Sequence, residues 1–122
     1  MASLYINYLV EIDGVGKVVI GLSRVKALKI INELNRLLPI STYVFVRNGV
    51  PYIYLGIGKG GMMSVECTRG KVLYDVSNDS LMICLGDYRI ESRRYLDVGV
   101  VVEGLEILES LESRRKAVIK KI

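Results

Sequence analysis

The feature that most restricts the fold of this sequence is a series of short β-type segments separated by turn residues. Residues 3–12 and 17–22 alternate or are rich in β-branched side chains, and Asp-Gly-Val-Gly lies between them as a turn. A second pair, 41–46 and 51–57, is joined through Asn48-Gly49, the strongest short signal for a β-hairpin. The sequence therefore predicts two antiparallel hairpins in the first half of the chain.

One long segment between the hairpins has helical periodicity. Ser23 is a suitable N-cap, and Pro39 ends the segment, so a helix is expected over about 23–38. Its apolar face contains Ala27, Leu28, Ile31, Leu34 and Leu38.

The second half of the chain adds more strands and a short helix. Strands are expected over 71–76, 81–86, 96–102 and 116–122, a helix over about 104–111, and an irregular polar loop over 87–95. Because a flat sheet of so many strands would expose its edges, we predict a mainly β, closed barrel of about eight strands. The long helix should close one end of this single domain, residues 1–122. The residues expected to be largely buried are Leu4, Ile6, Val19, Val44, Ile53, Val72, Ile83, Val98 and Val100.

The glycine-rich stretch YLGIGKGGMM, residues 54–63, raises the question of a phosphate-binding loop. Such a loop requires a strand before it and a helix after it. Residues 62–76 contain β-branched residues and a Thr-Arg-Gly turn without helical periodicity. We therefore predict a connection between strands, with Lys59 in solvent.

Composition excludes several kinds of chemistry. Histidine is absent, which removes histidine-based acid–base catalysis and Ser-His-Asp triads. Cys67 and Cys84 lie in apolar runs and are expected to be reduced core residues. Asp75, Asn78 and Asp79 surround a turn and are expected to cap it, so no metal and no cofactor is predicted.

The location and source are also suggested by composition. No apolar stretch is long enough to span a bilayer, and the N-terminus has no basic segment of a signal peptide, so a cytoplasmic protein without a membrane partner is expected. The lack of histidine and the abundance of Ile, Val, Tyr, Lys and Arg favour a thermophilic source.

Several motifs together resemble the small, minimal cyclophilin-like proteins of bacteria and archaea, for which no firm function is established. These motifs are Leu38-Pro39, Tyr52-Ile53-Tyr54, Gly70-Lys71-Val72-Leu73-Tyr74, Ile83-Cys84-Leu85-Gly86 and the strand and helix of 98–112. The resemblance covers nearly the whole chain and implies a cyclophilin-like barrel. The tryptophan-containing motifs of that family are missing, because the chain has no tryptophan.

The resemblance also implies candidate site residues. Arg36-Leu37-Leu38-Pro39 is similar to the cyclophilin motif around the catalytic arginine, which would make Arg36 the donor to a prolyl nitrogen. The ligand-binding floor would be formed by Phe45, Met82, Cys84 and Tyr95. From its position on the helix, however, Arg36 is expected to face solvent or a carboxylate.

Three functions follow as alternatives. The first is a cyclophilin-like module that binds a peptide or small ligand on the barrel face without strong catalysis. The second is a peptidyl-prolyl cis-trans isomerase that uses Arg36. The third, less expected, is a nucleic-acid-binding barrel, because the net charge is +4 and basic residues cluster late in the chain. These basic residues are Arg93, Arg94, Arg114, Arg115, Lys116, Lys120 and Lys121.

Overall fold

The structure, a computed structural model, describes residues 4–59, 65–90 and 95–122. In the first half of this described part, the elements are β1 (Tyr5–Ile12), β2 (Gly16–Ser23), α1 (Leu28–Leu37), β3 (Ile40–Arg47) and β4 (Val50–Tyr54). In the second half they are β5 (Val65–Cys67), β6 (Lys71–Asp75), β7 (Ser80–Ile83), β8 (Tyr88–Ile90), β9 (Tyr95–Glu103), α2 (Leu105–Glu109) and β10 (Arg115–Lys121).

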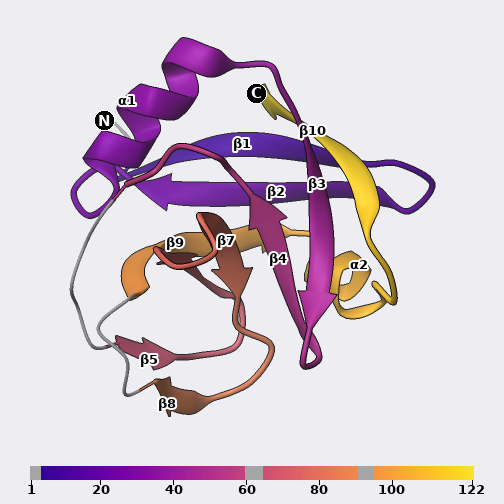
Figure 1. Cartoon of the computed structure of the whole chain (residues 1–122). Helices are drawn as coiled ribbons and strands as arrows, with labels where there is room; N and C mark the ends of the chain where they lie inside the picture. The colour runs from indigo at the N-terminus through magenta and orange to yellow at the C-terminus, as the bar shows by residue number, and fades with distance from the viewer. Residues whose placement is uncertain (1–3, 60–64, 91–94) are drawn as a thin grey trace.

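Eight of these strands form a closed antiparallel barrel in the order β1-β10-β3-β4-β7-β6-β9-β2. The helices α1 and α2 lie at opposite ends of the barrel, and β5 and β8 form a separate two-stranded ribbon beside it (Figure 1). The predicted mainly β, closed barrel of about eight strands with two helices is therefore confirmed.

The hairpin turns follow from the sequence. Between β3 and β4, Asn48 has φ 53° and Gly49 has φ 76°, so both residues of the two-residue turn occupy the left-handed region. This is the conformation of a type I′ turn, which Asn-Gly favours because it matches the twist of the strands. The predicted hairpin at 48–49 is confirmed.

The barrel interior is filled by alternate residues of the strands together with the buried face of α1, which is made by Ile30, Ile31 and Leu34. Five predicted core residues are fully buried, and these are Val44, Ile53, Val72, Ile83 and Val98. Ile6 and Val19 are half-buried, and Ile6 packs against the core.

Two predicted core residues are exposed. Leu4 precedes β1 and is 69% exposed, and Val100 is 37% exposed. The register between β6 and β9 shifts after Val72, which adds one residue to β9 at Val98. Because such a bulge reverses the alternation of side chains, Val101 packs against the core and Val100 faces outward.

The predicted bounds of the long helix were wrong at its start. The strand β2 continues to Ser23, whose hydroxyl oxygen accepts a hydrogen bond from the backbone N–H of Lys26 at 3.1 Å. Ser23 therefore caps a turn rather than the helix, and α1 begins at Leu28. The helix ends at Leu37, one residue before the predicted end at Leu38, and the short helix α2 lies within the predicted range.

The segment expected as an irregular polar loop contains β8. Its residues Tyr88–Ile90 pair with Val65–Cys67 of β5 in an antiparallel ribbon. Three-residue strands are too short for alternation to identify them in a sequence.

Candidate functional site

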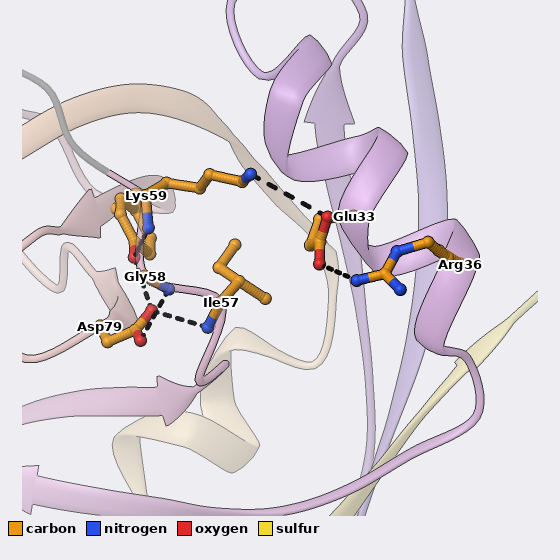
Figure 2. Close-up of polar contacts among 7 residues, drawn as sticks. Glu33, Arg36, Ile57, Gly58, Lys59 and Asp79 are labelled. Carbon is orange, nitrogen blue, oxygen red and sulfur yellow. Dashed lines mark hydrogen bonds and ion pairs between the residues drawn. The ribbon is translucent and has the colours of Figure 1, made fainter.

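The glycine-rich connection after β4 is held by a carboxylate of the chain itself. The backbone N–H groups of Ile57 and Gly58 donate to the two carboxylate oxygens of Asp79 at 3.0 and 2.9 Å. The Tyr74 hydroxyl donates to the same carboxylate at 2.5 Å and accepts the N–H of Lys59 at 3.1 Å. Figure 2 shows Asp79 beside this loop, where its carboxylate accepts two consecutive backbone N–H groups, as a bound phosphate does in a nucleotide-binding loop.

The next described element after this loop is the strand β5, which supports the prediction of a connection between strands. Gly60 and Gly61 lie outside the described residues. Burial and the hydrogen bond to Asp79 both raise the pKa of Tyr74, so the phenol remains a donor at neutral pH. The internal carboxylate makes this loop a structural feature rather than an anion site.

Arg36 is exposed, as its position on the helix predicted. Its guanidinium pairs with Glu33 on the same helix, and its side chain is 67% exposed. Lys59, expected in solvent, instead lies 3.9 Å from the other carboxylate oxygen of Glu33, so that Glu33 lies between the two cations (Figure 2). The hydrogen bond from Arg36 lowers the pKa of Glu33.

The four predicted ligand-binding residues lie in one cluster on the outer face of the barrel. Met82 and Cys84 are buried there, and Phe45 and Tyr95 pack against them in part. Phe45, Tyr52, Met82 and Leu73 are consecutive register partners across β3, β4, β7 and β6, so they form one apolar row on this face. Arg36 belongs to neither this cluster nor the hollows described below.

The prediction of reduced cysteines was wrong. Cys67 and Cys84 form a disulfide, with their Cα atoms 5.5 Å apart, and both are fully buried. The bond ties β5 across the outer cluster, so Cys84 is covered and offers no thiol to a ligand. Cytoplasmic location stays a prediction, and a disulfide is compatible with it in hyperthermophiles, whose intracellular proteins are rich in such bonds.

The accessible part of this outer face is a surface that the sequence analysis did not identify. Tyr43 stacks on Tyr54 with ring centroids 5.1 Å apart and planes at 10°, and Phe45 stacks on Tyr52 at 5.0 Å and 5°. The guanidinium of Arg114 lies 3.8 Å from the centroid of Tyr43, and that of Arg47 lies 5.6 Å from the centroid of Phe45. We call these residues the aromatic–arginine surface: the partly exposed Tyr43, Phe45 and Tyr54, the buried Tyr52 on which Phe45 stacks, and the exposed Arg47 and Arg114.

Two open hollows adjoin the aromatic–arginine surface. The smaller, of about 230 Å³, is lined by Tyr43, Phe45, Arg47 and Arg114. The larger, of about 770 Å³, shares Tyr43 and Arg114 and extends along β3 and β10. Its other lining residues are Ser41, Thr42, Arg115, Lys116, Ala117 and Val118. Both linings therefore contain cations and aromatic rings without a carboxylate.

A third hollow, of about 490 Å³, lies beside the β1–β2 turn. Its lining mixes carboxylates with lysines, and Lys120 there is paired with Glu11. Two carboxylates lie among its three lysines and no aromatic ring lines it, so this hollow is less suited to an anionic, flat ligand than the other two.

The turn between β6 and β7 uses its polar side chains internally. The carboxylate of Asp75 accepts hydrogen bonds from the backbone N–H groups of Ser77 and Asn78 at 3.0 and 3.3 Å, and from the Asn78 amide at 2.6 Å. Within the described ranges, no three acidic or cysteine side chains gather in a way that could hold a metal ion.

The sequence contained a signal for the aromatic–arginine surface. Tyr43, Phe45 and Arg47 are spaced two apart before the Asn-Gly turn, and Tyr52 and Tyr54 are spaced two apart after it. Since side chains two apart share a face of a strand, the hairpin register places all five on one side.

Comparisons with known proteins give a fold but no family. No family model and no curated protein matches the sequence. Among solved structures, the chain is similar to the solution structure of the hypothetical protein AF2241 from Archaeoglobus fulgidus, with a TM-score of 0.78 and 14% identity over 99% of this chain and 98% of that one. Neither described helix has the length and apolar character needed to cross a membrane. The chain thus shares a closed, mainly β barrel architecture with an archaeal protein of hypothetical status.

Proposed function

We propose that this chain is a cyclophilin-like module that binds a peptide or small ligand on the outer face of its barrel, without strong catalysis. The observation that carries the proposal is the aromatic–arginine surface, where two arginines lie on partly exposed aromatic rings beside open hollows. An apolar lining with a few convergent polar groups is the usual composition of a ligand site.

The ligand suited to this surface has an anionic group next to a flat or apolar group. The rings of Tyr43 and Phe45 offer the apolar contact, and the guanidinium groups of Arg47 and Arg114 can each donate two parallel hydrogen bonds to a carboxylate or phosphate. Arg47 is already oriented by a 2.7 Å hydrogen bond to the Asn78 side chain, so one donor group is held in place before binding.

Weak or absent catalysis is proposed because of Arg36. Prolyl isomerisation by this mechanism requires an arginine that donates to the prolyl nitrogen inside an apolar pocket. Arg36 is exposed and paired with Glu33, and Met82 and Cys84 are buried beneath other side chains.

Binding is tested by NMR titration of the labelled chain with two anionic probes, an acidic tyrosine-containing peptide and a nucleoside monophosphate. We expect shift changes confined to 43–47, 52–54 and 114 for at least one probe. Arg114→Gln should weaken that binding about fivefold, the equivalent of about 1 kcal/mol. Arg69→Gln is the matched control, since Arg69 is exposed and paired with Glu109. If neither probe shifts these residues, the proposed function is wrong.

Catalysis is tested with a protease-coupled assay on an X-Pro peptide. We expect the background rate, and Arg36→Ala should change the free energy of unfolding by at most about 0.5 kcal/mol, as at other surface sites. An enhanced rate that Arg36→Ala lowers by roughly two powers of ten would favour the isomerase instead.

A further inference from the structure

We propose that the anionic ligand of the aromatic–arginine surface is single-stranded nucleic acid. This inference rests on the proposed function, because it uses the same surface as a ligand site and adds the class of the ligand. The sequence had made a nucleic-acid-binding barrel the less expected alternative, because no aromatic residues alternate with the basic residues within the basic clusters of the chain.

The first step concerns the rings. Tyr43, Phe45 and Tyr54 are half-buried, so each ring is fixed by its stacked partner while part of it stays accessible. Bases of single strands stack on such rings whatever their identity, because every base has a flat face. The guanidinium of Arg114 lies 3.8 Å from the centroid of Tyr43 and covers that face of the ring, so a base there stacks on the exposed arginine plane, as bases also do.

The second step concerns the charges. Arg47, Arg114 and Lys116 are exposed, and in the described part of the chain none of them is ion-paired with a carboxylate. Lys116 is the register partner of Tyr43, so its charge lies on the strand beside the rings. The cations therefore form a strip along β3 and β10 that remains available to an external anion.

The third step is the match between rings and charges. The surface offers three partly exposed rings and three cations without a carboxylate partner in one connected area, since Tyr52 itself is buried. A nucleic-acid strand repeats one phosphate and one base per nucleotide, whereas an acidic peptide carries few flat groups per charge. A duplex hides its base faces, so a stacking platform selects unpaired strands.

The experiment measures fluorescence anisotropy of a short labelled oligothymidylate at several salt concentrations. If Arg47, Arg114 and Lys116 each neutralise one phosphate, the slope of log K against log salt is about −2 for a single strand. The affinity should then fall about 20-fold between about 50 and 200 mM salt, and about sevenfold for Arg114→Gln.

Each variant has a matched control. Arg36→Gln removes the same charge from an exposed site on α1 and should leave the slope unchanged. Tyr43→Ala should weaken binding roughly tenfold or more, whereas Tyr88→Ala, at an exposed tyrosine of β8, should not. If Tyr43→Ala does not fold, Arg114→Gln and Arg47→Gln carry the test, because both arginines are exposed.

Each possible result decides the inference. The inference is supported if binding depends on salt and is weakened by Tyr43→Ala and Arg114→Gln but not by the control variants. Equal binding of duplex and single strand, or an equal loss with Arg36→Gln, would mean non-specific attraction to the net positive charge and overturn it. Binding of the acidic tyrosine-containing peptide without the oligonucleotide would overturn the inference and leave the proposed function standing. Failure of both the peptide and the nucleoside monophosphate contradicts the proposed peptide or small-ligand site, and failure of the oligonucleotide as well removes the inference too.

Discussion

Reduction of the Cys67–Cys84 disulfide should lower the stability of the chain by a calculable amount. The two cysteines are 17 residues apart, and closing a loop of that length in the unfolded chain corresponds to about 3 kcal/mol in the chain-entropy model. Chemical reduction of the disulfide tests this loop-closure contribution without a mutation that would change a side-chain volume. The free energy of unfolding should therefore fall by about 3 kcal/mol.

The assay is urea unfolding followed by circular dichroism, with and without a phosphine reductant. With a slope of about 1.5 kcal/mol per molar, the midpoint should move down by about 2 M. The unfolding entropy expected for 122 residues converts the same change into a lower melting temperature of about 12 °C. Mass measurement after thiol labelling verifies that the bond was reduced.

The control is a chain with both Cys67→Ala and Cys84→Ala, which should not respond to the reductant. Reduction should also speed hydrogen exchange in β5, because the bond ties this short strand to the end of β7. A midpoint that moves by less than about 0.5 M on complete reduction would refute the loop-closure argument.

Two further predictions concern a half-buried carboxylate and a buried phenol. Asp79→Asn should lower the free energy of unfolding by about 1–2 kcal/mol, because the N–H groups of Ile57 and Gly58 lose a charged acceptor. Asp13→Asn, at an exposed turn, is the control and should change this free energy little. Urea unfolding measures both variants, and equal effects would contradict the role of the Asp79 carboxylate. Burial raises the pKa of Tyr52 to about 12, so its contribution to stability is complete below about pH 10, where the unfolded phenol ionises, and is lost as the pH rises through about 12. Ultraviolet titration of phenolate should show one fewer late-ionising tyrosine in Tyr52→Phe, and an unchanged late phase would show the prediction to be wrong.

Much of the fold was predictable from local signals because the strands of the barrel are bounded by turn residues, by Pro39 or by segments with helical periodicity. The alternation of 5–12 and the Asn48-Gly49 turn fix the two hairpins without any distant information. The exposure of Val100 was not predictable in this way. It depends on a bulge opposite Val72, and the sequence of β9 alone does not reveal where its partner loses register.

The disulfide was missed for a related reason. An apolar context correctly indicated that Cys67 and Cys84 are buried, and burial is also what a reduced core cysteine would show. What decides between the two states is whether the Cα atoms come within about 7 Å. That distance depends on how the ribbon of β5 and β8 folds back on β7, a contact between segments that no local pattern specifies.

The candidate site was predictable in part from local sequence spacing and depends in part on contacts between distant segments. The rings of Tyr43 and Tyr54 belong to one hairpin, so spacing alone could have placed them on a common face. Arg114 and Lys116 come about 60 residues after that hairpin and reach it only because β10 closes the barrel against β3. Taken separately in the sequence, the aromatic residues indicate core packing and the basic residues indicate solvent-exposed charges. Barrel closure turns them into one surface, and for this reason the binding experiments vary a ring on β3 and a cation before β10 in the same assay.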